Sequence, residues 1–297
     1  MTRLADLADL VRAPAALSVP GDVLSGAAAA GALGPRTPAL AGASVLLYWA
    51  GMAANDWADR RLDALERPER PIPSGRVRPA VALGVASGLT AAGLAVATAA
   101  GGRRAAAVAL PLAATIWGYD LRAKNTAAGP AVMAACRGLD VLLGASGGRV
   151  VRALPAALTV AAHTWTVTAL SRREVTGADR RLPGLTLAGT ALIALATPAR
   201  PTPPATGRGG SSRAARLGNL VPAVLAAGYA TRYGRAQARV LADPSPARVR
   251  AAVGAGITGL PALQGALTAR AGARMLGLAV AGAAPLGRRL ARLISPT

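Results

Sequence analysis

Apolar runs of nearly membrane-spanning length recur along the whole chain and constrain its fold more than any other feature. A helix needs about 20 apolar residues to cross the ~30 Å hydrocarbon core of a bilayer, and several of these runs are slightly shorter. The sequence therefore predicts an all-α integral membrane protein, folded as one multi-helix domain over residues 1–297, with eight, nine or ten transmembrane helices. The runs fall at residues 14–33, 38–54, 79–100, 105–119, 129–147, 153–170, 183–199, 214–231, 250–268 and 273–287.

The composition favours a membrane protein over a soluble one. Of the 297 residues, 53% are hydrophobic and 16% are charged, whereas about a quarter of the residues in soluble domains are charged. Ala, Val, Leu and Gly supply most of the apolar content, and small residues allow helices to pack closely in a bilayer. An Ala-rich soluble helical protein is the alternative, and the regular recurrence of the long runs argues against it.

The net charge of +21 does not indicate a nucleic-acid partner. Lys124 is the only lysine, and the arginines occupy short breaks between apolar runs rather than one amphipathic face. Aromatic residues, on which bases would stack, are scarce. The single cysteine, Cys136, excludes an intrachain disulfide. Residues 1–12 contain two aspartates and lack the pattern of a cleavable signal peptide.

Loop charge predicts the orientation in the cell membrane. If the N-terminus is cytoplasmic, the cytoplasmic loops are residues 55–78, 120–128, 171–182 and 232–249, and they hold about twice as many Arg and Lys residues as the opposite loops. We therefore expect a multi-pass protein, surrounded by membrane lipids, whose N-terminus and Asp-rich segment face the cytoplasm. Residues 200–213 are expected to form a flexible external linker.

Acidic residues cluster at the end of one apolar run. The chain has 13 of them, and five lie between residues 56 and 69. If the helix continues past residue 54, Asp56, Asp59 and Asp63 stand at i, i+3 and i+7 and share one face, and Asn55 adds a neutral oxygen. Oxygen-only ligands favour a hard cation such as Mg²⁺. The alternative is a solvated helix end on which Asp and Arg side chains pair at the surface.

The residues that follow, ERPERPIPSGR (66–76), form a proline-stiffened loop that cannot be helical throughout. This loop returns arginines, including Arg67 and Arg70, toward the carboxylates. Carboxylates that hold a metal, combined with guanidinium groups that bind phosphate, are what diphosphate recognition requires. The combination favours a functional site over a solvated helix end.

Together, NDWADRRLD (55–63) and RPERPIPSGRV (67–77) resemble the first Asp-rich motif, NDxxDxxxD, and the downstream loop of the UbiA family of membrane prenyltransferases. The resemblance implies about nine transmembrane helices around a central cavity. It also implies Mg²⁺-dependent transfer of an isoprenoid chain from a prenyl diphosphate to a small-molecule or lipid acceptor. Asp56, Asp59 and Asp63 would then be catalytic and, with Asn55, would hold the metal.

A second block, YDLRAK (119–124), resembles the family's loop that carries a tyrosine and a diphosphate-binding lysine. The resemblance implies that Tyr119 and Lys124 bind the diphosphate together with the two loop arginines. Arg12 lies in a segment that resembles the family's entry to its first helix and is a weaker candidate for the same role. The alternative for Lys124 is a cationic anchor on the cytoplasmic side.

Arg137 and Asp140 stand at i, i+3 inside the apolar run 129–147. Ionisable residues within a membrane are costly and normally pair with one another or face a cavity. We expect these two to line the acceptor end of the cavity, and a structural Arg–Asp pair between helices is the alternative. His163, the only histidine, is expected to be a satisfied buried imidazole rather than an acid–base catalyst.

The chain departs from the family at its second Asp-rich motif. In the corresponding segment, SRREVTGAD (171–179), only Glu174 and Asp179 are available as metal ligands, and their i, i+5 spacing is poor for one helical face. The resemblance therefore leaves a second metal held differently, bound weakly or missing. The blocks CRGLDVLLG (136–144) and SRREVTG (171–177) resemble a divergent branch of the family from actinobacteria and cyanobacterial gene clusters.

Prenyl transfer is the predicted activity, and three other functions are weighed against it. A non-catalytic UbiA-like protein that binds or moves a prenylated lipid is suggested by the degraded second motif. A secondary transporter is disfavoured, because the acids lie at a membrane face rather than in mid-bilayer and no convincing inverted repeat is present. A structural membrane subunit with surface charges alone is the third.

Overall fold

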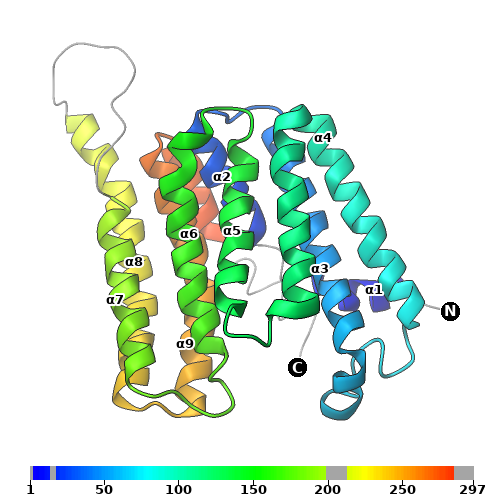
Figure 1. Ribbon diagram of the computed structural model, residues 1–297. Coiled ribbons are helices and arrows are strands. Elements are labelled where there is room, and N and C mark those ends of the chain that lie inside the picture. Colours follow the sequence, from blue (N-terminus) through cyan, green and yellow to red (C-terminus); the bar gives the residue numbers. More distant parts are fainter. Residues whose placement is uncertain (1–2, 14–17, 199–212, 284–297) are drawn as a thin grey trace.

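The computed structural model describes residues 3–13, 18–198 and 213–283, and the regular elements within these ranges are all helical (Figure 1). Long helices stand side by side and are joined by short loops, as expected for a membrane bundle. In chain order the elements are α1 (Leu4–Leu10), α2 (Val19–Ala30), α3 (Thr37–Glu66), α4 (Pro79–Gly118), the π-helical turn η2 (Tyr119–Ala123), α5 (Gly129–Ala145), α6 (Val150–Ser171), α7 (Arg181–Ala196), α8 (Arg213–Ala242) and α9 (Pro246–Arg270). A further short helix covers Arg274–Ala283.

Proline marks the points at which several helices begin. α2, α3, α4, α5 and α9 each carry proline at one of their first two positions, where the missing N–H removes no helical hydrogen bond. From there α3 runs for 30 residues, so its last turns carry the Asp-rich segment as continuous helix. The expected helical extension beyond residue 54 is confirmed.

A sharp reversal at Gly102 divides α4 into two antiparallel halves (Figure 1). Gly102 has φ 63° and ψ −154°, a conformation that only glycine adopts without strain. The indole N–H of Trp117 donates a hydrogen bond to Thr90 Oγ1 at 3.1 Å, which ties the end of the second half to the middle of the first. The separate apolar runs predicted at 79–100 and 105–119 are therefore two adjacent helical segments.

The bundle has the character of a membrane protein. Thr37–Glu66, Pro79–Ala123 and Val150–Ser171 are long and apolar enough to cross a bilayer by length and composition. Other predicted spans are shorter than about 20 residues or, like α8 and α9, carry several arginines. The loops after α3, η2, α6 and α8 gather at one end of the bundle (Figure 1, bottom). These are the basic loops that the charge pattern groups on one side of the membrane.

Small residues bring α2 and α5 into direct backbone contact. A Cβ atom added at Gly144 would overlap the carbonyl group of Val23, and one added at Gly26 would overlap the carbonyl oxygen of Val141. Close approach of this kind replaces bulky interdigitation in membrane bundles, where the lipid tails are as apolar as the side chains. Glycine at these two positions is therefore a packing requirement.

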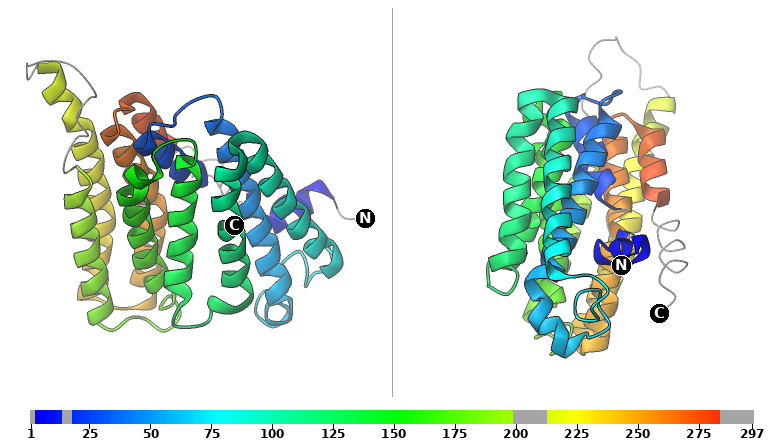
Figure 2. Two further views of the ribbon diagram at one scale, coloured as in Figure 1. Left: turned by 45° about the horizontal axis from the view of Figure 1, so that its top comes forward. Right: turned by 90° about the vertical axis from the view of Figure 1, so that its right-hand side faces the viewer.

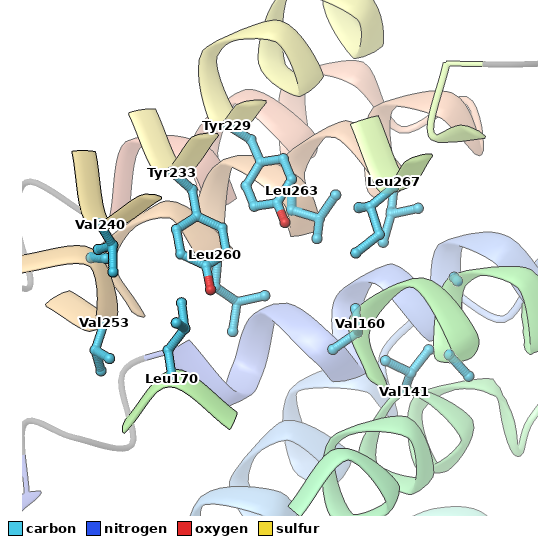
Figure 3. Packing of buried hydrophobic residues seen from close by; sticks show 14 of the residues in the cluster. Val141, Val160, Leu170, Tyr229, Tyr233, Val240, Val253, Leu260, Leu263 and Leu267 are labelled. Carbon is cyan, nitrogen blue, oxygen red and sulfur yellow. The ribbon is translucent and has the colours of Figure 1, made fainter. Parts of the chain in front are cut away.

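A hydrophobic core joins α5, α6, α7, α8 and α9 around Tyr229 and Tyr233 (Figure 3). His163 is buried beside them, and its Nδ1 lies 2.9 Å from the hydroxyl oxygen of Tyr229. The hydroxyl groups of Thr166 and Tyr233 lie 3.2 Å apart. The prediction of a satisfied, buried histidine is confirmed.

Some predicted features lie outside the described residues. These are residues 14–17 of the first apolar run, residue 199 at the end of the seventh run, residues 284–287 of the last run, and nearly all of the predicted linker at 200–213.

Candidate functional site

The last turns of α3 carry the oxygen-bearing side chains that the sequence singled out, and three other segments surround them. The loop 67–78 folds back beside these turns, η2 follows the second half of α4, and α1 approaches from the N-terminus. Asp56 and Asp63 are buried, with side chains 4% and 2% exposed, whereas Asp59 is 22% exposed. The burial of two carboxylates distinguishes this helix end from a solvated one.

Arg70 of the loop bridges two carboxylates that stand two turns apart. Its Nη1 lies 2.8 Å from Asp63 Oδ2 and 3.3 Å from Asp56 Oδ1. Arg12 adds a contact of 2.6 Å to the same oxygen of Asp56, and Arg67 lies 3.6 Å from Asp63 Oδ1. The three arginines predicted for diphosphate binding are therefore all gathered at the predicted carboxylates.

Lys124 forms a second bridge on the neighbouring row of α3. Its Nζ lies 2.6 Å from Asp59 Oδ1 and 2.9 Å from Asn55 Oδ1. Asn55 and Asp59 are four residues apart and so share one helical row. The predicted oxygen set is thus divided between two adjacent rows, one bridged by arginine and the other by lysine.

A cavity of about 230 Å³ opens beside this row. Gly51 is part of its wall, and a Cβ there would come within 2.6 Å of Ile116 Cγ2, so a larger residue would push α3 and α4 apart. Tyr119, a predicted site residue, lines the cavity. The complete lining is Arg12, Tyr48, Gly51, Met52, Asn55, Ile116, Tyr119, Asp120, Met133 and Cys136.

α1 lies beside the loop 67–78 (Figure 2), and ion pairs connect the two. The guanidinium group of Arg76 lies 3.2 Å from Asp6 Oδ1 and 2.9 Å from Asp9 Oδ2. Arg12 itself has φ 45°, in the left-handed region that is unfavourable for a residue with a side chain. The chain thus turns sharply after α1, and the Arg12 guanidinium reaches Asp56.

Arg137 and Asp140 occupy a buried polar network that joins α2, α3, α5 and α9. Arg137 Nε lies 2.7 Å from Asp22 Oδ2, and the Arg137 guanidinium lies over the ring of Tyr48, 5.5 Å from its centroid. Asp140 accepts a hydrogen bond from the Ser44 hydroxyl. Gln264 donates to Asp22 Oδ1 at 2.6 Å. Neither Arg137 nor Asp140 lines the 230 Å³ cavity, although Tyr48 connects the two regions.

Glu174 and Asp179 lie in the loop between α6 and α7. The backbone carbonyl of Glu174 accepts a hydrogen bond from Arg250, and partial burial raises the pKa of its carboxyl group. Asp179 Oδ1 accepts from the Leu182 N–H at 2.9 Å, which caps the start of α7. Arg172, in the same loop, donates to the Thr126 carbonyl and so connects this loop to the segment that follows Lys124.

The donor set at the end of α3 fits a hard divalent cation by its chemistry, because it consists of one amide oxygen and three carboxylates. Asp63 Oδ1 is buried and accepts no hydrogen bond. Within the part of the chain that the structure describes, however, no three His, Cys, Asp or Glu side chains are gathered into a metal site. The carboxylates face Arg12, Arg70 and Lys124 instead.

Two buried acids escaped the sequence analysis as site residues. Asp120 is 6% exposed and lines the cavity, and Asp22 is fully buried against Arg137. Asp22 could have been found as the one acid within the first apolar run, because an isolated carboxylate inside a membrane segment requires a partner. Asp120 stands next to the predicted Tyr119, and only the π-helical turn η2 determines which way it points.

The family model and the similar curated proteins point to the same family of membrane prenyltransferases. Residues 21–199 match the model of the UbiA prenyltransferase family. Two curated digeranylgeranylglyceryl phosphate synthases are similar over short stretches. The protein from Methanothrix thermoacetophila is 53% identical over 49 residues, which are 16% of this chain and 18% of that protein. The protein from Natronomonas pharaonis is 44% identical over 85 residues, which are 28% of this chain and 31% of that protein. The matched stretches therefore span less than a third of these relatives.

Two solved structures share the fold. A digeranylgeranylglyceryl phosphate synthase structure superposes with a TM-score of 0.67 at 16% identity, covering 91% of this chain and 99% of the other. The structure of a UbiA homologue from Aeropyrum pernix gives a TM-score of 0.58 at 18% identity, covering 82% and 96%. At these identities the likeness concerns the architecture, and it confirms the predicted all-helical membrane fold.

Proposed function

Because this chain belongs to the UbiA prenyltransferase family, we propose that it transfers an isoprenoid group from a prenyl diphosphate to an acceptor within the membrane. The observation that carries the proposal is the pairing of the α3 carboxylates, two of them buried, with cations from three other segments. Both kinds of charged group are needed to bind a metal ion together with a diphosphate. The carboxylates suit the metal, and the guanidinium and ammonium groups suit the phosphates.

The bridges that Arg70 and Lys124 form to side chains of α3 support specific roles for these two cations. Arg70 and Lys124 now neutralise oxygens of α3, because a buried unpaired carboxylate is costly. When a prenyl diphosphate binds, we expect these two cations, with Arg12, Arg67 and the Tyr119 hydroxyl, to turn to the phosphate oxygens. The side chains of α3 are then released to hold a metal.

The residues that would hold Mg²⁺ are Asn55, Asp56, Asp59 and Asp63, and the bound ion would neutralise the diphosphate and improve it as a leaving group. Arg70 and Lys124 would stabilise the charge that grows on the diphosphate oxygens as the C–O bond breaks. The bonding electrons leave with the diphosphate, and the isoprenoid carbon becomes an allylic cation that the acceptor captures with loss of a proton.

The cavity suits the isoprenoid end of the substrate. Tyr48, Ile116 and Met133 give part of its wall an apolar or aromatic surface next to Asn55 and Asp120. An apolar wall beside the charged groups excludes water, which would otherwise capture the allylic cation. We therefore expect the first isoprenoid units to lie along this wall, with the diphosphate toward Lys124.

Arg137 and Asp140 remain our candidates for the acceptor end, acting through Tyr48, whose ring lies beneath the Arg137 guanidinium. Glu174 and Asp179 remain candidates for a second metal ion. The contact between Arg172 and the Thr126 carbonyl supports the idea that their loop can approach the diphosphate site. We further propose that this end of the bundle faces the cytoplasm, because its loops carry the excess of basic residues.

A second candidate function is non-catalytic binding of a prenylated lipid. It is favoured by the ion pairs that now join every carboxylate of the motif to a cation, and by the engagement of Asp179 in capping α7. A protein of this kind would bind the prenyl diphosphate without cleaving pyrophosphate from it. Binding therefore does not separate the two functions, and turnover does.

The test uses purified protein in detergent and radiolabelled geranylgeranyl diphosphate. Acceptors are a membrane extract and geranylgeranylglyceryl phosphate, the acceptor implied by the name of the two curated relatives. We expect labelled lipid product with Mg²⁺ and none after chelation by EDTA. Mg²⁺-dependent binding of the diphosphate without product, across both acceptors, would favour the lipid-binding alternative.

A further inference from the structure

A basic groove lies on the outer face of α8 and α9, at the opposite side of the bundle from α3 (Figure 1). It encloses about 740 Å³. Arg232, Arg235 and Arg239 line it from α8, and Arg248 lines it from α9. Small residues, including Ala251 and Ala255, leave space between the two helices.

The arginines of α8 occupy one exposed stripe. Arg232, Arg235 and Arg239 stand at i, i+3 and i+7, and all three are exposed. The opposite face of α8 carries Tyr229 and Tyr233, which are fully buried in the core. The stripe therefore faces away from the bundle interior and away from the cavity proposed for prenyl transfer.

Among the described residues, the groove is lined by four arginines and by no acidic side chain. Arg232 donates a hydrogen bond to Thr258 Oγ1 at 3.0 Å. Arg248 Nε lies 3.4 Å from Asp243 Oδ2, and both of these side chains are more than half exposed. In the described part of the chain, Asp243 is the acid that forms an ion pair with an arginine of the groove. Arg235, Arg239 and Arg248 thus line a space beside which one exposed carboxylate forms an ion pair.

The groove lies between the end of α8 and exposed apolar residues farther along the same helix. α8 ends at Ala242, and at 1.5 Å per residue Arg232 lies about 15 Å before that end. Toward the other end of α8, Leu220 and Val224 are 54% and 65% exposed. Guanidinium groups next to lipid-facing apolar residues are costly unless an anion pairs with them.

We propose that this groove is a binding site for the phosphodiester headgroup of an anionic phospholipid. The guanidinium groups of Arg235 and Arg239 bind the phosphate oxygens, and Arg248 closes the groove from α9. The acyl chains lie along Leu220 and Val224, which share the face of α8 that carries the arginines. Basic pockets between transmembrane helices are suited to anionic headgroups, and the proposal is independent of prenyl transfer because the groove and the site on α3 share no residue.

The test compares two double variants that remove the same charge. Arg235→Gln with Arg239→Gln alters the groove, and Arg103→Gln with Arg104→Gln alters two exposed arginines at the Gly102 reversal. Each protein, purified in detergent, is titrated with phosphatidylglycerol, phosphatidylcholine or inorganic phosphate, and its melting temperature is followed. We expect phosphatidylglycerol alone to stabilise the wild type and the Arg103/Arg104 control, and the groove variant to require about tenfold more of it.

Three outcomes would overturn the proposal. Equal response of both double variants to phosphatidylglycerol would mean that any basic surface suffices. Equal stabilisation by phosphatidylcholine would mean that the headgroup charge is not recognised, and equal stabilisation by inorganic phosphate would mean that a free anion is the ligand. If the groove variant does not fold, Arg235→Lys with Arg239→Lys and the single Arg248→Gln change replace it, with weakened phosphatidylglycerol binding again expected and unchanged binding again contradictory.

Discussion

The ammonium group of Lys124 lies 2.6 Å from Asp59 Oδ1 and 2.9 Å from Asn55 Oδ1, so one side chain joins η2 to two successive turns of α3. Lys124 is also the only lysine of the chain. An ammonium group is a compact charge that can exchange a carboxylate for a phosphate oxygen without a fixed planar geometry. The contact therefore connects the Asp-rich helix to the proposed binding of the diphosphate.

Lys124→Gln should lower prenyl transfer by about 10²-fold, because it removes a cation that would stabilise the leaving diphosphate. Arg122→Gln, an exposed change two residues away, is the matched control and should retain most of the activity. Initial rates at saturating prenyl diphosphate measure the effect. Equal rates in the two variants would show that Lys124 acts only as a cationic anchor.

Arg76→Gln should raise the KM for the prenyl diphosphate more than it lowers kcat. Arg76 holds α1 through Asp6 and Asp9, and a loosened α1 would let Arg12 move away from Asp56. Arg78→Gln, also exposed and close in sequence, serves as the control. A loss confined to kcat would contradict a positioning role for this connection.

The connection of α1 should also depend on pH. A hydrogen bond from the Arg3 backbone N–H and the nearby Arg76 side chain lower the pKa of Asp6. The folded-state pKa of Asp6 is therefore lower than its unfolded-state pKa. The stability that the Asp6 carboxylate contributes is fully present above the usual Asp pKa of about 4. It is lost as pH falls through the folded-state pKa. Protease cleavage near the N-terminus should accelerate over that acidic range, and Asp6→Asn should remove the pH dependence.

Gly144→Ala should destabilise the bundle by about 1–3 kcal/mol, because its Cβ would overlap the Val23 backbone, which cannot move aside like a flexible side chain. Gly84→Ala is the matched control, since a Cβ there meets nothing within 4 Å and Gly→Ala in an open helical position is neutral or stabilising. Thermal unfolding in detergent measures both. A higher melting temperature for Gly144→Ala would contradict the close packing of α2 and α5.

Arg137→Met should cost about 3–5 kcal/mol, because it leaves the buried carboxylate of Asp22 without its cation. Asp22→Asn with Arg137→Met should cost less than the sum of the two single changes, since the double variant no longer leaves a carboxylate at position 22 without its cation. Unfolding free energies of the four proteins in this cycle measure the coupling. Additive costs would indicate that Arg137 interacts chiefly with something other than Asp22.

Much of the fold follows from the sequence, because apolar run length and loop charge are local properties. The reversal at Gly102 falls between two predicted runs, and the helical spacing of Asp56 and Asp63 is reflected in their shared contact with Arg70. What the sequence could not provide is which segments meet. The partner of Arg137 is Asp22, far away in the chain, rather than the neighbouring Asp140, and only tertiary packing determines that choice.

The residue types of the site were predictable from the sequence, whereas which cation pairs with which carboxylate was less so. The carboxylates and cations were identified from spacing and from the family resemblance, whereas the division into an Arg70 row and a Lys124 row depends on how η2 and the loop 67–78 fold back onto α3. The placement of Asp120 in the cavity wall depends on the π-helical turn, for which the sequence gives no periodic signal.

Pyrophosphate release from geranylgeranyl diphosphate in the presence of Mg²⁺ and a membrane extract is the most direct test of the central claim. The comparison is between Asp56→Ala with Asp59→Ala and a control, Glu66→Ala with Glu69→Ala, that removes two exposed acids from the same region. We predict release by the wild type and the control, and its loss in the Asp56/Asp59 variant. Release that persists in the Asp56/Asp59 variant at the wild-type rate would contradict the assignment of the site.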